Sequence, residues 1–179
     1  MSRMFADITN YNNNSDWLYL VIGAIVVDLL VIIMARYPGP YFKFGVLNEW
    51  YDRFGINAAI ADITSALIGL AAARYIYGLA GLKGPLMFLL AMLLFQVFHD
   101  IFFYLAVILP LPAGENEMID VFKAYAQENG AMILVADALI LLASAGIGSF
   151  LKGLPVHYTA STGIVAIYSL MYILYTKRT

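Results

Sequence analysis

Long apolar runs alternate with short polar connections along this chain. Five runs carry few charged residues, at 17–36, 56–79, 85–109, 130–151 and 157–175. The hydrocarbon core of a bilayer is ~30 Å thick and a helix rises ~1.5 Å per residue, so about 20 apolar residues cross it. The pattern therefore predicts about five transmembrane helices, with aromatic residues and prolines marking several of their ends.

The composition supports this interpretation and excludes other classes. Of the 179 residues, 63% are hydrophobic and 12% are charged, whereas a soluble domain has about 25% charged residues. A net charge of -2 without a basic cluster offers no attraction to a nucleic acid. We expect an all-α, polytopic membrane helical bundle in the lipid bilayer, with a polar N-terminal tail at 1–16 and no nucleic-acid partner.

Basic residues are divided unequally between the two sides that five spans define. The side of the C-terminus holds six, namely Arg36, Lys43, Arg53, Lys123, Lys177 and Arg178, and the other side holds four. Lys and Arg are more frequent in cytoplasmic loops. The distribution predicts an integral membrane protein with a cytoplasmic C-terminus.

The pattern of scarce residues occurs twice. A shift of 72 residues pairs Asp28 with Asp100 and Pro38 with Pro110, and a shift of 75 pairs Trp50 with Tyr125, Gly55 with Gly130 and Asp62 with Asp137. We predict a tandem duplicated Asp-bearing helical hairpin, 17–79 and 85–151, followed by one additional transmembrane helix at 157–175. Two crossings separate the copies, so they would be parallel repeats.

The duplication places four aspartates at similar depth. Asp28 and Asp100 lie ten residues before the proline that ends their helix, and Asp62 and Asp137 lie seven residues after a glycine. These spacings correspond to ~15 Å and ~10 Å from the same membrane side. Acidic residues are costly inside a membrane and tend to face the bundle interior. The four carboxyls are our candidates for an ion-binding or proton-binding layer.

His99 is a fifth candidate, because it is the only histidine expected at this depth and imidazole can carry protons. Polar side chains on the same helix faces could support the layer. These are Gln96, Ser65, Ser144 and Tyr104.

Three interpretations of the layer stay open. Protonated aspartates could hold the helices together by hydrogen bonds, or the layer could conduct protons or cations as a transporter or channel. A metal site is the third, although no known ligand spacing is present. Because no nucleophile, phosphate-binding or dinucleotide motif occurs, we expect no catalytic residues, no cofactor and a non-enzymatic protein.

Two connecting segments, FKFGVLNEWYDRFG and ENEMIDVFKAYAQENG, place apolar residues at helical spacing among charges. This pattern is typical of amphipathic helices that lie on a bilayer surface. We predict two interfacial helices that anchor the protein to the membrane.

Four stretches, LNEWYDRFGINAAIADI, ARYIYG, FHDIFFYL and MIDVFKAYAQENGAMILVADALI, together resemble small multi-spanning membrane proteins of large nucleocytoplasmic DNA viruses. The resemblance covers residues 27–151. It implies residence in the internal membrane of a virion, beneath the capsid, where partners would be further copies of the chain or other membrane or capsid proteins. It implies no catalytic residue.

Overall fold

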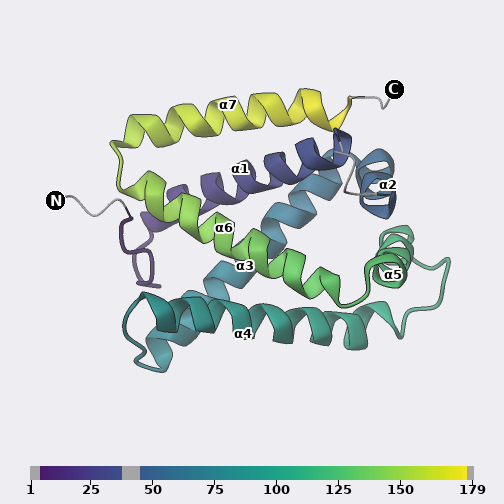
Figure 1. The fold of residues 1–179 in the computed structure, drawn as a ribbon, viewed down its shortest axis with the longest axis horizontal. Helices are drawn as coiled ribbons and strands as arrows, with labels where there is room; N and C mark the ends of the chain where they lie inside the picture. Colours follow the sequence, from purple (N-terminus) through teal and green to yellow (C-terminus); the bar gives the residue numbers. More distant parts are fainter. Residues whose placement is uncertain (1–4, 38–44, 177–179) are drawn as a thin grey trace.

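The computed structural model describes residues 5–37 and 45–176, and this part of the chain is helical without strands. The elements are α1 (Asp16–Arg36), α2 (Gly45–Phe54), α3 (Ile56–Leu79), α4 (Pro85–Phe103), a π-helical segment (Tyr104–Ile108), α5 (Glu117–Asn129), α6 (Met132–Lys152) and α7 (Val156–Leu174) (Figure 1). The predicted all-α class is confirmed.

Four helical stretches are long and apolar enough to cross a membrane: α1, α3, α4 with its π-helical continuation, and α6. They correspond to the first four predicted spans and indicate an integral membrane protein. Helix α7 occupies the fifth predicted span but is not among the four. Its first half, VHYTAST, is rich in polar residues, which lowers the mean hydropathy of a helix of only 19 residues.

The first long helix of each half packs against the second long helix of the other half. Helix α1 contacts α6, and α4 contacts α3. Figure 1 shows α3 and α6 crossing between α1 and α4, with α7 running along the outer side of α1. The two halves are therefore interleaved, and neither forms a bundle by itself.

Small residues allow α1 and α6 to approach closely. A Cβ atom on Gly23 would lie 2.6 Å from the Ser144 carbonyl oxygen and 2.9 Å from the Gly148 nitrogen, and one on Gly148 would lie 3.1 Å from the Tyr19 carbonyl oxygen. Small residues are common where transmembrane helices touch. The face of α6 that carries Ser144 and Gly148 is thus the face that packs on α1.

Helices α2 and α5 lie beside each other at one end of the bundle (Figure 1). A Glu128 carboxylate oxygen accepts a hydrogen bond from the Val46 backbone nitrogen at 3.0 Å, and the Trp50 and Phe122 rings are 4.8 Å apart. Trp50 and Tyr51 are only 3% and 2% exposed. The prediction that these apolar faces lie on the bilayer is wrong, because they pack on the protein's own helices. We call α2 and α5 together the lid.

Arg36 fastens one half of the lid to the bundle. Its guanidinium forms an ion pair with Asp52 and donates a hydrogen bond to the Leu174 carbonyl oxygen at 2.7 Å. The Asn48 side chain donates to the Ala35 carbonyl oxygen at 2.8 Å. Helix α2 is therefore tied to the ends of α1 and α7.

Each lid helix is joined to the following long helix by a glycine in the same unusual conformation. Gly55 has φ 52° and ψ −127°, and Gly130 has φ 54° and ψ −137°. Residues with a Cβ rarely adopt a positive φ, whereas glycine does so without penalty. The two glycines, which the shift of 75 residues pairs, make equivalent turns from α2 into α3 and from α5 into α6.

The N-terminal segment, predicted as a polar tail, packs along the opposite end of the bundle. The Ala6 nitrogen donates to the Ser149 carbonyl oxygen at 3.1 Å, and the Ser149 hydroxyl donates to the Ala6 carbonyl oxygen at 2.5 Å. Ile8 is 4% exposed and joins a hydrophobic cluster with Leu20 and Leu70. This segment therefore covers the bundle end that lies away from the lid.

Candidate functional site: the aspartate layer

Asp62 is held by the lid. The Trp50 indole nitrogen lies 3.1 and 3.2 Å from the two carboxyl oxygens of Asp62, and the Tyr51 hydroxyl donates to one of them at 3.0 Å. Both donors come from α2, which the turn at Gly55 folds back beside α3. Sequence reasoning identified Asp62 but missed these partners, because it assigned the apolar face of α2 to the membrane.

Asp28 lies inside the bundle without such support. Its side chain is 5% exposed, and its Oδ2 atom is buried with no hydrogen-bond partner in the described part of the chain. It is close enough to Asp62 for the two carboxylate charges to repel each other. A buried carboxylate without a partner is strongly unfavourable in a medium of low dielectric constant. Asp28 therefore requires a proton or a cation.

Asp100 has partners on one oxygen only. Its Oδ1 accepts a hydrogen bond from the Gln96 amide at 2.7 Å and lies 3.2 Å from Nδ1 of His99. Its Oδ2 is buried without a partner among the described residues. The His99 ring also stacks with Phe95 and Phe103, each with a centroid distance of 6.0 Å. The structure thus brings together Gln96, His99 and Asp100 as one polar group on α4.

Asp137 is partly buried, and no hydrogen bond reaches its side chain within the described residues. The charges of Asp100 and Asp62 act on it, as the charge of Asp62 acts on Asp28. The four carboxyls therefore form a connected set, running from Asp28 through Asp62 and Asp137 to Asp100. All four lie in the lid half of their helices, as the spacings predict.

In the described structure, no hydrogen bond joins the remaining predicted supporting residues to this set. The fully buried Ser144 hydroxyl donates to the Ile140 carbonyl oxygen of its own helix at 2.8 Å. Ser65 is exposed on α3. Tyr104 is 40% exposed and lines a cavity of about 160 Å³ together with residues of α5.

The described part of the chain brings no lysine or arginine side chain into an ion pair with the layer. Among the residues that the structure describes, only His99 is near enough to one of the four aspartates to form an ion pair, and it would do so only when protonated. The same residues include no group of three His, Cys, Asp or Glu side chains arranged to hold a metal ion. Several adjacent carboxylates cannot all be ionised in a buried site.

Tyr125 of the lid faces the second half of the layer. Its burial, and then the nearby charges of Asp137 and Asp62, raise the pKa of the Tyr125 hydroxyl to about 12. Burial likewise raises the pKa of Tyr51 well above its ordinary value. Both phenols therefore keep their protons at neutral pH and can act as hydrogen-bond donors to carboxylates.

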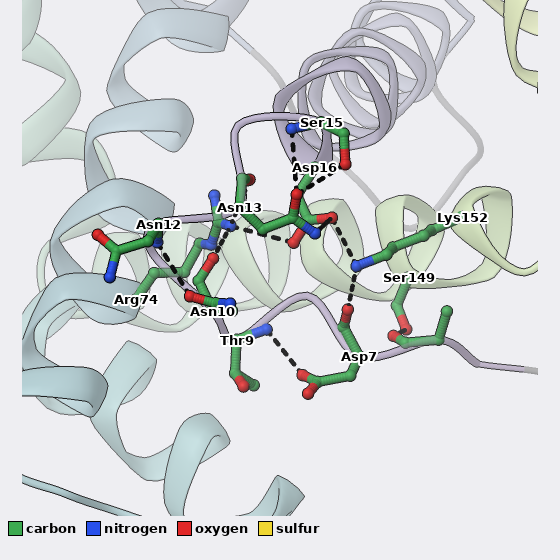
Figure 2. A network of polar contacts seen from close by, with 11 residues as sticks. Asp7, Thr9, Asn10, Asn12, Asn13, Ser15, Asp16, Arg74, Ser149 and Lys152 are labelled. Carbon is green, nitrogen blue, oxygen red and sulfur yellow. Dashed lines mark hydrogen bonds and ion pairs between the residues drawn. The ribbon is translucent and has the colours of Figure 1, made fainter.

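A second buried aspartate cluster lies at the opposite end of the bundle and was not predicted. Asp16, at the start of α1, forms ion pairs with Arg74 of α3 at 3.1 Å and with Lys152 of α6 at 2.5 Å, and both Asp16 and Arg74 are fully buried (Figure 2). Arg74 also donates to the backbone carbonyl oxygens of Asn10 and Asn13. We call Asp16, Arg74 and Lys152 the N-terminal clamp.

Further contacts surround the clamp, although Nε and Nη1 of Arg74 are buried without a hydrogen-bond partner among the described residues. The Arg74 guanidinium lies 5.2 Å from the centre of the Trp17 ring, a cation–π contact. The Lys152 ammonium donates to the Asp7 carbonyl oxygen. A hint was available in the sequence, because Arg74 and Lys152 each stand near the end of an apolar helix and Asp16 stands at the start of another.

Comparisons with known proteins give no relative: no family model matches the chain, and no curated protein or solved structure matches it. The clamp surrounds one carboxylate with two cations, whereas among the described residues only His99, when protonated, could form an ion pair with the aspartate layer.

Proposed function

We propose that the protein is a non-enzymatic integral membrane protein that conducts protons through its aspartate layer. The observation that carries the proposal is the buried Asp28 oxygen without a hydrogen-bond partner. A carboxyl group that only cross-links helices would gain its stability from hydrogen bonds, and Asp28 receives none from the described residues. Ionisable groups of this kind inside transmembrane segments mark proton and ion pathways in many membrane proteins.

Protons suit this layer better than metal ions. A metal ion would require several oxygen or nitrogen ligands around one point, and the described residues include no such group. A proton needs one carboxyl at a time and can pass between neighbouring acids. The sequence of interacting pairs, Asp28 with Asp62, Asp62 with Asp137 and Asp137 with Asp100, supplies acceptors on four different long helices.

The proposal includes two features of the whole chain. Helix α7 would be a fifth crossing, with the C-terminus in the cytoplasm. The two halves would be copies of one hairpin, which is supported by their common order of long helix, lid helix, glycine and long helix, and by the matching conformations of Gly55 and Gly130.

A second candidate function is structural, with the layer serving to hold the helices together in a viral internal membrane. The observation in its favour is Asp62, whose contacts with Trp50 and Tyr51 fix the lid to α3. The resemblance to proteins of large DNA viruses supports this location. Partners would then be further copies of the chain or other membrane or capsid proteins.

Proton flux distinguishes the two functions. Purified protein is placed in liposomes that contain a pH-sensitive dye, and flux is driven by an imposed potential. We expect flux in the wild type and its loss in Asp28→Asn and in Asp62→Asn, since an amide cannot exchange a proton in this way. Glu115→Gln, at an exposed acid outside the layer, is the matched control and should retain flux. Wild-type flux equal to that of empty liposomes would reject conduction and favour the structural function.

A further inference from the structure

The two halves of the lid hold their aspartates differently. The shift of 75 residues that pairs Asp62 with Asp137 also pairs Trp50 with Tyr125. In the first half, the Trp50 indole donates to both oxygens of Asp62. In the second half, the charge of Asp137 acts on the Tyr125 hydroxyl, but no hydrogen bond joins their side chains among the described contacts. Asp62 and Asp137 are both partly buried, but a lid helix donates hydrogen bonds to Asp62 and, among the described residues, none to Asp137.

A sequence difference explains part of this asymmetry. Tyr51, which gives Asp62 its second donor, corresponds to Ala126 in the second half, which has no donor side chain. Around Trp50, the rings of Phe54 and Phe122 lie 5.0 and 4.8 Å away and fix the indole in place. Asp62 is therefore covered by two buried donors, and Asp137 by none.

The lid helix that covers Asp62 is also the more firmly anchored of the two. Helix α2 is tied to α1 and α7 through buried Arg36. Beside α5, by contrast, lies the cavity of about 160 Å³, lined by Tyr104, Lys123 and Gln127 among others. Tyr104 follows Asp100 by one helical turn, so the cavity lies near the Asp100 end of the layer, although none of the four aspartates lines it. The α5 side of the lid therefore has space beside it, whereas α2 is tied to the bundle.

Near the opposite end of the bundle, the described structure has a larger cavity of about 400 Å³ between α3 and α4, but only apolar side chains line it. The rest of that end is covered. The N-terminal segment crosses it, and the clamp fills it with fully buried Asp16 and Arg74. An exchange path between the layer and water is therefore most direct through the lid.

We infer that protons enter the layer through the α5 half of the lid, at Asp137, and that Trp50 and Tyr51 are positioning residues that keep Asp62 closed to water. This inference rests on the proposed proton conduction and assigns its side of entry. The ionisable groups that act on Asp137 are Asp100 and Asp62, and Tyr125 of α5 faces it. Asp137 would exchange protons with water and pass them to Asp62 and Asp28.

The reactivity of the carboxyls with a water-soluble carbodiimide tests the inference in the unmodified protein. The reagent reacts with carboxyl groups that it can reach, and mass spectrometry measures the extent at each aspartate within the same molecules. Because a covered site reacts only when the structure opens locally, we expect Asp137 to react about tenfold faster than Asp62. Equal rates, or a faster reaction at Asp62, would overturn the inference.

Variants of the lid give a second measurement. Trp50→Phe combined with Tyr51→Phe removes both donors but keeps the rings, and should raise the rate at Asp62 towards that at Asp137. Tyr125→Phe is the matched control, because it removes a lid hydroxyl that is not among the described donors to Asp62 and should leave the rate at Asp62 unchanged. An Asp62 rate that does not respond to the double variant would contradict the positioning role.

The two assays separate the inference from the function on which it rests. Faster reaction at Asp137 without any proton flux would reject conduction while retaining the open and closed halves of the lid. Proton flux with equal carbodiimide rates would retain conduction and reject entry at Asp137.

Discussion

Two polar clusters occupy the two ends of this bundle, and both are built around buried aspartate. In the N-terminal clamp, Asp16 is in contact with two cations, Arg74 and Lys152, and accepts a further hydrogen bond from the Asn13 amide. In the aspartate layer, four carboxyls come together, and the Oδ2 atoms of Asp28 and Asp100 have no partner in the described part of the chain.

The difference teaches how to separate structural from functional acids. A buried ion pair is costly to break, because removal of one partner leaves an unpaired charge. In the clamp, the buried atoms without a partner among the described residues are Nε and Nη1 of Arg74, whereas the carboxylate of Asp16 is bonded on both oxygens. The charged groups of such a pair stabilise each other in their ionised forms and do not readily exchange protons. A buried carboxylate without a partner costs stability, so the Oδ2 atoms of Asp28 and Asp100 are the atoms on which the proposed proton conduction depends.

The largest expected effect follows from breaking the clamp. Asp16→Ala would leave Arg74 fully buried without its carboxylate, and we expect a loss of about 3 to 5 kcal/mol in the free energy of unfolding. Thermal unfolding in detergent, followed by helical circular dichroism, measures the loss. If Asp16→Ala unfolded at the wild-type temperature, the clamp would not stabilise the fold.

A smaller effect is expected when the clamp keeps its charge but loses its geometry. Arg74→Lys preserves the positive charge but cannot reach Asp16, Asn10 and Asn13 together, because an ammonium lacks the planar fork of the guanidinium. We expect a destabilisation of about 1 to 3 kcal/mol, the size of a hydrogen bond to a charged group. A variant as unstable as Asp16→Ala would show that the hydrogen bonds, and not the charge, dominate.

The layer should respond in the opposite way. Asp28→Asn removes an ionisable group that has no partner, so we expect the free energy of unfolding to stay within about 0.5 kcal/mol of the wild type or to increase. The same variant should lose proton flux. The same unfolding assay compares it directly with Asp16→Ala, and a loss as large as that of the clamp variant would remove the distinction between the two clusters.

The smallest effect concerns the edge of the clamp and its dependence on pH. A hydrogen bond from the Thr9 backbone nitrogen at 2.8 Å is the main cause that lowers the pKa of Asp7 below its ordinary value of 3.8. A lowered folded-state pKa contributes stability above the ordinary value, and this contribution disappears as the pH falls below about 3.8 through the folded-state pKa. Asp7→Asn should therefore reduce the acid sensitivity of the N-terminal segment.

Hydrogen exchange of backbone amides near Thr9, measured from about pH 3 to about pH 6, would detect this contribution. The wild type should lose protection at the acid end, whereas Asp7→Asn should show little change across the range. Identical pH profiles would assign the stability of the segment to the hydrophobic contacts of Ile8 instead.

Much of the fold followed from the sequence because it depends on local properties. The first four predicted spans match observed helices to within one to two residues. The depth of the aspartates followed from the fixed rise of a helix, and the small face of α6 with Ser144 and Gly148 indicated close packing. The π-helical end of α4 and the marginal apolar character of α7 were not anticipated.

The partners within each cluster could not be read from the chain. Trp50 and Tyr51 were assigned to the lipid, since an apolar helix face looks the same whether it meets a bilayer or other helices. Asp16 and Arg74 are 58 residues apart, and nothing in their local sequence joins them. Ser65 and Ser144 were placed beside aspartates by helical spacing, but a shared face does not ensure contact.

The sequence by itself determined that this protein is helical and membrane-embedded, and that its acids lie at similar depth, because hydropathy and helical rise are properties of each segment alone. Only the tertiary structure decided which acids are neutralised. Packing of α3 on α1 brings Arg74 to Asp16, packing of α6 on α1 adds Lys152, and the turn at Gly55 brings two donors to Asp62. The described residues leave the Oδ2 atom of Asp28 without a partner, because side-chain pairing depends on which helices become neighbours.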